Sequence, residues 1–218
     1  MKKLAMLLAI AAIAAYATGA FAFLNEDGKI VVSLRGIDAK GRCEWPTQPT
    51  PTNCSQLVLQ GAINTPYHCQ ILVADFNNLT AEEFGLSYPP HIFVGTDKLD
   101  CTPNAFVLKS PSPPFPASGS GVVIAHSCVN YTGTLLNLGF IYVFAYAPGT
   151  LCIAGSCRAN TAELTDCQGK TDVIWPIPGM PSHLGCVGFG EIAGYDGSCG
   201  VSTPVTPSTW GNIKALYK

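Results

Sequence analysis

Ten cysteines are the residues of this chain with the clearest chemical potential. They are Cys43, Cys54, Cys69, Cys101, Cys128, Cys152, Cys157, Cys167, Cys186 and Cys199. Zinc sites usually draw on closely spaced cysteine pairs with histidine partners. Here no C-x-x-C occurs, and the closest pair, Cys152 and Cys157, has no histidine nearby. The spacing therefore predicts neither a metal site nor a redox motif, and the even number favours disulfides in an oxidising compartment.

Connectivity does not follow from spacing alone, so locality ranks the pairs. Cys43 and Cys54 flank a Pro/Thr-rich loop, and closing such a loop stabilises a fold by about 2–3 kcal/mol in the chain-entropy model. We predict, in order of preference, the pairs Cys43/Cys54, Cys101/Cys128 and Cys152/Cys157, and then Cys167/Cys199 and Cys69/Cys186.

Residues suited to catalysis are present but form no recognised motif. The four histidines are His68, His91, His126 and His183. The segment Ala117–Gly121 lacks the first glycine of a G-x-S-x-G elbow. The adjacent carboxylates Glu82 and Glu83 suit the first turn of a helix better than acid/base work. We therefore predict no enzyme, and keep as an alternative a secreted hydrolase whose site is assembled across the fold.

Cofactor and calcium motifs are also missing. No P-loop or dinucleotide fingerprint occurs, so we expect no cofactor. Asn25–Gly28 and Asp196-Gly197 offer oxygen ligands without the spaced D-x-D-x-D pattern of a calcium loop. We interpret both segments as turns.

An aromatic row comes from a single apolar segment, 138–147. Phe140, Tyr142, Phe144 and Tyr146 alternate along it and would share one face of a strand. Such a row is either core or a platform on which sugars stack, and we predict core. Trp45 and Trp175, each beside a proline, are alternative exposed aromatics.

Three segments match the N-glycosylation pattern N-x-[ST]. They begin at Asn53, Asn78 and Asn130. The signal peptide described below is of bacterial type, so we interpret the matches as chance, with a glycan at Asn78 or Asn130 as the alternative.

Composition limits the fold and the partners. Only 12% of the residues are charged, while the chain holds 22 glycines and 17 prolines. This composition, rich in turns and in β-branched and aromatic residues, predicts an all-β domain. The formal charge of −2 becomes −4 without Lys2 and Lys3, and no basic block occurs, so a nucleic-acid partner is not expected.

The N-terminus predicts export. Two lysines precede an apolar stretch from Leu4 to about Ala17, and Ala20-Phe-Ala22 supplies the small residues of a cleavage site. We therefore predict a signal peptide over 1–22 and a mature chain that is secreted to the cell surface or beyond. No later segment is apolar and long enough for a membrane span.

The mature chain predicts a disulfide-braced β-sandwich, a jelly-roll or Greek-key with little helix, over 23–201. Strands are expected over 30–37, 56–60, 67–76, 84–88, 92–94, 106–108, 121–126, 138–147, 172–175 and 185–189. A helical turn is expected at Thr80–Glu83, which fits a capping box. A Pro/Thr spacer over 202–209 precedes a tail over 210–218, in which Trp210, Ile213, Leu216 and Tyr217 are apolar.

Two resemblances add to this interpretation. Glu83-Phe-Gly-Leu-Ser-Tyr-Pro89 and Tyr142-Val-Phe-Ala-Tyr146 resemble, as a strand pattern, the jelly-roll sandwiches of cohesin modules. Ile37–Cys43, Gly188–Tyr195 and the ending Thr209–Lys218 resemble exported bacterial proteins that share a T-W-G-x-[IVL]-K-x-[LM]-[YF]-[KR] tail. The second resemblance implies export and no activity, and it makes Cys69, Cys152 and Cys157 additions to the shared cysteine set.

Our leading hypothesis is a non-enzymatic structural protein of the cell surface, a surface-layer component or a fibre subunit. Either Phe23–Leu34 or the tail would add a strand to a neighbour's sheet, so the expected partners are other copies or other surface proteins. A carbohydrate-binding or adhesion module is the main alternative, with glycans as partners. The tail has two further interpretations, a sorting signal or a frayed terminus.

Overall fold

The computed structural model describes residues 25, 27–37, 43–44, 49–130, 132–176 and 182–200. The predicted signal peptide, the spacer and the tail lie outside these ranges. The described residues form an all-β fold with strands β1 to β12 and one short 3₁₀ helix, η1 (Cys54–Gln56). None of their helices is long and apolar enough to cross a membrane.

The smaller sheet has four antiparallel strands in the order β1-β3-β8-β5. Their bounds are Lys29–Arg35 for β1, Pro66–Ala74 for β3, Leu136–Ala145 for β8 and Ile92–Lys98 for β5. The predicted central strand over 138–147 is confirmed as β8, which has a partner on each edge. Among the described residues, β1 and β5 are the edge strands of this sheet.

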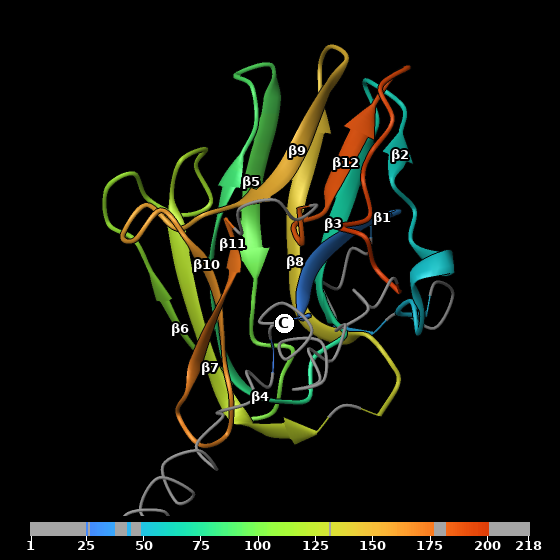
Figure 1. Ribbon diagram of the computed structural model, residues 1–218. Helices are drawn as coiled ribbons and strands as arrows, with labels where there is room; N and C mark the ends of the chain where they lie inside the picture. Colours follow the sequence, from blue (N-terminus) through green and yellow to red (C-terminus); the bar gives the residue numbers. More distant parts are fainter. Residues whose placement is uncertain are drawn as a thin grey trace, which may run out of the picture.

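The larger sheet has eight strands and is built around β4 (Asn78–Ser87). One edge of β4 pairs with β7 (Gly121–Asn130), which in turn pairs with β6 (Phe106–Lys109). The other edge of β4 pairs with β9 (Gly149–Ala154) and β10 (Ala162–Thr165). Beyond these lie β12 (Cys186–Phe189), β2 (Gln60–Gly61) and β11 (Thr171–Trp175). In Figure 1, β6 and β2 lie on opposite sides of the molecule.

The main core fills the space between the two sheets. Alternation along the strands points Ile30, Val32 and Leu34 of β1 into this core, where they meet Phe84 and Phe189 of the larger sheet. All of these side chains are almost fully buried. The predicted β-sandwich with little helix is therefore confirmed.

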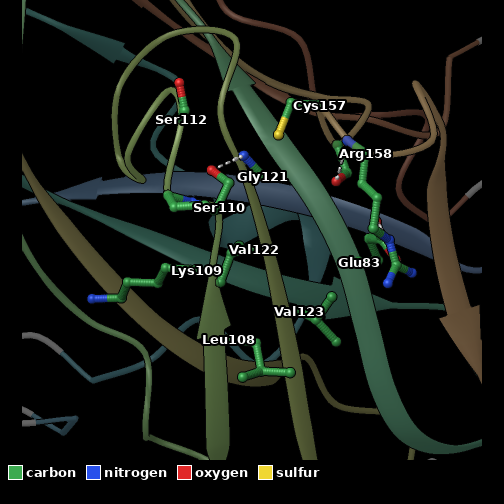
Figure 2. A pocket seen from close by; sticks show the side chains of 12 residues that line it. Glu83, Leu108, Lys109, Ser110, Ser112, Gly121, Val122, Val123, Cys157 and Arg158 are labelled. Carbon is green, nitrogen blue, oxygen red and sulfur yellow. Dashed lines mark hydrogen bonds and ion pairs between the residues drawn. The ribbon is translucent and has the colours of Figure 1, made fainter.

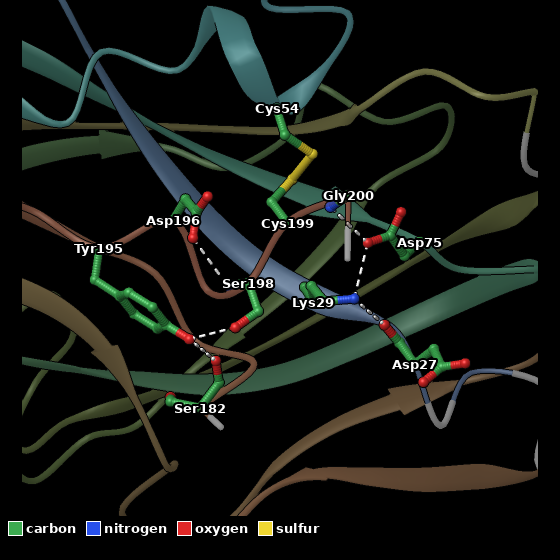
Figure 3. Close-up of polar contacts among 10 residues, drawn as sticks. All are labelled: Asp27, Lys29, Cys54, Asp75, Ser182, Tyr195, Asp196, Ser198, Cys199 and Gly200. Carbon is green, nitrogen blue, oxygen red and sulfur yellow. Dashed lines mark hydrogen bonds and ion pairs between the residues drawn. A yellow bond between two sulfur atoms is a disulfide. The ribbon is translucent and has the colours of Figure 1, made fainter. Parts of the chain in front are cut away.

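A second, smaller cluster covers the outer face of β1 and β3. It contains Val31, Leu72 and Leu135, with the Cys54–Cys199 disulfide above them. Beside it, the buried Lys29 Nζ donates to Asp75 Oδ2 at 2.8 Å and to the Asp27 carbonyl at 2.9 Å (Figure 3). The C-terminal segment up to residue 200 is thus fixed over β1.

Four disulfides form, and none has the predicted pairing. The pairs are Cys43–Cys101, Cys54–Cys199, Cys128–Cys167 and Cys152–Cys186. The predictions Cys43/Cys54, Cys101/Cys128, Cys152/Cys157, Cys167/Cys199 and Cys69/Cys186 are therefore wrong. Locality failed because a sandwich brings distant segments together, and these pairs are 34 to 145 residues apart in sequence.

The prediction that all ten cysteines pair is also wrong, since Cys69 and Cys157 are free thiols. Cys69 points into the main core from β3, and burial raises the pKa of its thiol. Cys152 lies opposite Cys186 in the β9–β12 register. Strand β9 then continues to Ala154, which leaves Cys157 exposed in the turn that follows.

Three local predictions fail. Residues 56–60 hold the end of η1 and the start of β2 rather than a strand of their own. Thr80–Glu83 lies within β4, because Phe84 and Leu86 bury the strand and pairing on both edges overrides a local capping preference. Strands β9 and β10 were not predicted; each is short, with six and four residues, although burial alternates regularly along both.

Candidate functional site

The predicted aromatic row lies on the outer face of the four-stranded sheet, not in the core. Ile141 and Val143 of β8 enter the main core, so the intervening Tyr142 and Phe144 point outward. Phe140 is buried, Tyr142 and Phe144 are half-buried, and Tyr146, just after β8, is 63% exposed. Both faces of this strand were apolar in sequence, and the smaller side chains are the ones that fit between the sheets.

Phe93 of the edge strand β5 extends this row. We call Phe93, Tyr142, Phe144 and Tyr146 the aromatic strip. Phe93 meets Tyr142 edge-on, with 6.1 Å between ring centroids and 71° between planes, and Phe144 meets Tyr146 at 4.8 Å and 59°. The rings therefore tilt against one another and do not form a flat platform. Tilted aromatics suit the irregular surface of another protein better than the flat face of a sugar ring.

The strip borders a side of the sandwich where both sheets end. Among the described residues, β5 pairs only with β8, and β6 pairs only with β7. Lys109 of β6 forms an ion pair with Asp97 of β5, so these two edges lie next to each other. We call the region of β5 and β6 the open side.

An opening of about 420 Å³ lies between the two edges. It is lined by Asp97, Lys98, Leu99, Asp100, Val107 and Lys109. Val107 and the neighbouring Val94 are only partly buried against the main core. The apolar interior is therefore less completely covered here than at β1, where every residue is buried.

Exposed apolar side chains lie on the outer faces of β5 and β6, outside the lining of the opening. Phe93 is 52% exposed on one sheet, and Phe106 and Leu108 of β6 are 62% and 55% exposed on the other. Phe106 and Leu108 share the outer face of β6, and exposed apolar patches of this kind mark interaction surfaces. The open side is therefore the strongest candidate for a binding surface among the described residues.

A shallow pocket of about 410 Å³ continues this surface over the larger sheet. Leu108, Val122 and Val123 line it, and its far wall is the turn that carries Cys157 and Arg158 (Figure 2). Arg158 Nη2 contacts Glu83 Oε2 at 2.6 Å, with the guanidinium side chain largely exposed. None of the lining residues is a histidine, so the Cys157 thiol has no imidazole base in this pocket.

The histidines are not brought together. His91 Nε2 lies 3.0 Å from the Pro148 carbonyl, His68 packs on Phe140, and His183 is buried. Burial lowers the pKa of His183, and the nearby Lys29 adds to this. A hydrolase assembled from these residues gains no support from their positions.

His126 has a carboxylate partner, but in the core. Its Nε2 lies 2.8 Å from Glu82 Oε1, and neither side chain is exposed. Burial raises the pKa of Glu82. Burial pushes the pKa of His126 down, but the Glu82 carboxylate and the Ser127 carbonyl outweigh this and raise it overall. The pair is inaccessible to a substrate, and its sequence neighbours gave no sign of this contact.

The other oxygen and sulfur clusters have structural roles. Asn25 Oδ1 accepts from the Asn77 amide and its Nδ2 donates to the Asn78 carbonyl, which joins the N-terminal turn to β4. Asp196 Oδ1 accepts from the Ser198 amide within a turn, as predicted. Cys43 and Cys101 meet Asp100, but the two sulfurs are joined as a disulfide and are not thiolate ligands.

The structure separates the two sequons that were kept as glycan alternatives. Asn78 and Asn130 are cross-strand neighbours in β4 and β7. Asn78 is half-buried and its Oδ1 accepts from the Cys167 amide at 3.3 Å, whereas Asn130 is exposed. Trp45 lies outside the described residues, and Trp175 is packed against the main core.

No protein-family model matches the chain, and no curated protein is significantly similar to it. A cohesin module from a Clostridium perfringens ATCC13124 family 33 glycoside hydrolase aligns with a TM-score of 0.44 and 8% identity, over 74% of this chain and 95% of that one. A type II cohesin domain from the cellulosome of Acetivibrio cellulolyticus gives 0.40 and 8%, over 66% and 87%. A non-cellulosomal cohesin from Archaeoglobus fulgidus gives 0.35 and 10%, over 66% and 82%. Because these TM-scores are below 0.5, the sandwich assignment rests on the strand pairing of this chain.

Proposed function

We propose that this chain is a non-enzymatic structural protein of the cell surface that binds other protein subunits, its own copies first, through the open side. The observation that carries the proposal is the pair of adjacent edge strands, β5 and β6, flanked on both faces by exposed phenylalanines. Edge strands offer unpaired backbone groups to another chain, and aromatic side chains supply much of the energy of protein interfaces.

Export agrees with this proposal. The N-terminal segment has the order of a secretory signal peptide, and four disulfides persist only in an oxidising compartment. Both features support our proposal that the mature chain acts at the cell surface or outside the cell. A fibre subunit is the finer form of the proposal, because edge strands suit strand addition.

Self-association of the mature chain, residues 23–218, tests the proposal. We expect sedimentation velocity and electron microscopy to show concentration-dependent oligomers. The double variant Phe93→Ser, Phe106→Ser should weaken association at least tenfold, since it removes the most exposed aromatic side chains of the two edges. The matched control is Val173→Ser on the edge strand β11, which is 44% exposed and distant from the open side. A wild-type monomer at high concentration would contradict the proposal.

Carbohydrate binding is the second candidate, and one observation favours it: the aromatic strip lies on an outer face, with Phe93 and Tyr146 more than half exposed. The tilt of its rings counts in the other direction. Titration with surface polysaccharides, using Tyr142→Ala and Tyr146→Ala as test variants, separates the two functions. Binding that disappears in both variants would make the strip a glycan site.

A further inference from the structure

We propose that the free thiol of Cys157 in one copy attacks the Cys152–Cys186 disulfide of a second copy and links the two copies covalently; this rests on the proposed function of self-association. Both groups lie on the outer face of the larger sheet. Cys157 supplies the nucleophile of a thiol–disulfide exchange, and the disulfide supplies the electrophile.

Cys157 supplies an accessible thiol. It lies in the turn after β9, where it is exposed and forms no disulfide. Val122 and Ile124 of β7 enter the main core, so Gly121 faces outward. A Cβ atom on Gly121 would lie 3.1 Å from the backbone nitrogen of Cys157, which places Cys157 over the outer face of β7 (Figure 2). The other free thiol, Cys69, is buried in the core and cannot react with another molecule.

The Cys152–Cys186 disulfide supplies an accessible electrophile on the same face. Leu151 and Ile153 of β9 and Val187 of β12 enter the main core, so the cysteines that alternate with them point outward. Both cysteines are partly exposed. Exposed disulfides exchange more readily than buried ones.

This disulfide joins strands that the backbone already holds together. Cys152 and Cys186 are directly opposed in the antiparallel pair of β9 and β12. The Cys186 amide also donates to the Tyr195 carbonyl at 2.7 Å, and the Tyr195 amide donates back at 2.9 Å. The strands therefore stay paired when the disulfide opens. The Cys128–Cys167 disulfide is accessible too, but it joins β7 to the turn after β10, and no pairing among the described strands holds these two segments together.

One copy cannot carry out the exchange within itself. Cys157 lies over β7 and Cys152 is in β9, with β4 between these strands, so two spacings of about 4.8 Å separate them. Along the strands, Gly121 pairs with Gly85 whereas Cys152 pairs with Ser87, which adds about 7 Å. The two cysteines are therefore roughly 10–12 Å apart, well beyond the ~7 Å between Cα atoms that a disulfide bridges.

A second copy brings the two groups together. The pocket that holds Cys157 has Leu108 of β6 as its opposite wall, so the thiol adjoins the surface through which we expect copies to associate. Each copy carries one such thiol and one such disulfide on a single face. A contact of this face around a twofold axis is reciprocal, so when one copy's Cys157 reaches the disulfide of the second copy, the second copy's Cys157 reaches back.

The exchange needs no oxidant. The Cys157 thiolate forms a new S–S bond to one sulfur of the Cys152–Cys186 disulfide, and the S–S bond between those two cysteines breaks. The other sulfur leaves as a thiolate and takes up the proton that Cys157 released. The numbers of thiols and disulfides are therefore unchanged, and one disulfide now joins two copies.

Non-reducing electrophoresis and thiol titration of the mature chain test the exchange. Concentrated protein is incubated at pH 8.5 without oxygen or added disulfide and is quenched with N-ethylmaleimide. We expect covalent dimers that keep two thiols per chain, formed more slowly at pH 6 because the attacking group is a thiolate. Cys157→Ser should give no covalent dimer, and the matched control Cys69→Ala should give as much as wild type. Dimers that have lost one thiol per chain would be products of oxidation and would overturn the exchange.

Mass spectrometry identifies the sulfur that is attacked. Labelled (¹⁵N) and unlabelled chains are mixed in equal amounts, and the quenched dimer is digested without reduction. We expect Cys157 peptides joined to Cys152 or Cys186 peptides of the other label, with the remaining cysteine of that pair alkylated. Links to Cys128 or Cys167, or links within one label only, would overturn the assignment. The variant Cys152→Ser, Cys186→Ser keeps Cys157 and should give no covalent dimer; if it does not fold, the alkylated cysteine in the wild-type digest decides.

Sedimentation velocity separates this inference from the proposed function. At pH 6, before links form, it measures the non-covalent association of wild type. If wild type associates but forms no covalent dimer at pH 8.5, the inference fails and the proposed function stands. If wild type stays monomeric at high concentration, both fail.

Discussion

The two lateral sides of the sandwich end their sheets in different ways. At β1 the edge is covered: Ile30 donates to the His183 carbonyl, Leu34 donates to the Val58 carbonyl, and all of β1 is buried. At β5 and β6 the described residues add no further strand, and an opening of about 420 Å³ separates the edges. One side is closed by the chain itself, and on the other side no further strand comes from the part of the chain that the structure describes.

The two sides also differ in their disulfides and ion pairs. The closed side holds the Cys54–Cys199 disulfide and the buried Lys29–Asp75 pair, both beside Gly200, where the described chain ends. The open side holds two ion pairs with exposed lysines. We therefore expect the closed side to contribute more to the stability of the fold than the open side does.

The largest expected effect is the loss of the disulfide on the closed side. The double variant Cys54→Ser, Cys199→Ser should lower the free energy of unfolding by about 3–5 kcal/mol, because this bond closes the longest loop in the chain. Urea denaturation of the mature protein measures it. Cys157→Ser is the control, since that exposed thiol is unpaired, and it should change stability by less than about 0.5 kcal/mol. If the double variant and Cys157→Ser lowered the free energy of unfolding equally, the prediction would be contradicted.

The buried ion pair on the closed side should stabilise the fold more than the partly exposed ion pair on the open side. Lys29→Met leaves Asp75 without its buried cation and should cost about 3 kcal/mol. Lys109→Met removes the ion pair with Asp97 from a partly exposed position and should cost no more than about 1 kcal/mol. Thermal unfolding of the two variants under identical salt conditions measures both losses of stability. A larger loss in Lys109→Met than in Lys29→Met would contradict the prediction.

Truncation of an apolar side chain should destabilise the fold more on β1 than on β6. Leu34→Ala on β1 removes a side chain that is 2% exposed and should cost about 3 kcal/mol. Val107→Ala on β6 removes a smaller and partly exposed side chain and should cost about 1 kcal/mol. The measurement is again the free energy of unfolding in urea, and similar losses would mean that the open side is as well packed as the closed one.

The buried Glu82–His126 pair makes stability depend on pH. Both pKa values are raised in the folded state, so the folded protein binds more protons than the unfolded chain. Stability from this pair is therefore present at mildly acidic pH and is lost as pH rises through the raised values. His183, whose pKa is lowered, contributes the opposite slope.

The variant Glu82→Gln, His126→Gln isolates that contribution from the contribution of His183. We expect its stability to fall less than that of wild type between pH 5 and pH 9, measured by urea unfolding at each pH. A steeper fall in the variant would contradict the assigned direction.

The sequence was sufficient for the fold class and for most strands, because apolar, β-rich segments such as 30–37 and 67–76 form strands that are buried along most of their length. It was not sufficient for disulfide pairing, since Cys152 meets Cys186 through strand order and not through proximity in sequence. It also misplaced the aromatic row, because both faces of 138–147 are apolar. Only the bulk of the opposing side chains, such as Phe84 and Phe189, decides which face fits the core.

The candidate binding surface was beyond sequence analysis for a related reason. Phe93 and Phe106 are in ordinary strand patterns, and nothing in their neighbours shows that β5 and β6 are edge strands. The edge position follows from the order of strands in each sheet, which depends on contacts between segments far apart in the chain.

Hydrogen exchange on the assembled protein tests the central claim most directly. Amide exchange is compared between wild type at high concentration, where it is assembled, and wild type diluted to the monomer, by mass spectrometry on matched peptides. We predict slower exchange in the assembly at Ile92–Lys98 and Phe106–Lys109, and no change at Lys29–Arg35, whose edge is already covered. Unchanged exchange at β5 and β6, with protection only in peptides elsewhere, would contradict the account.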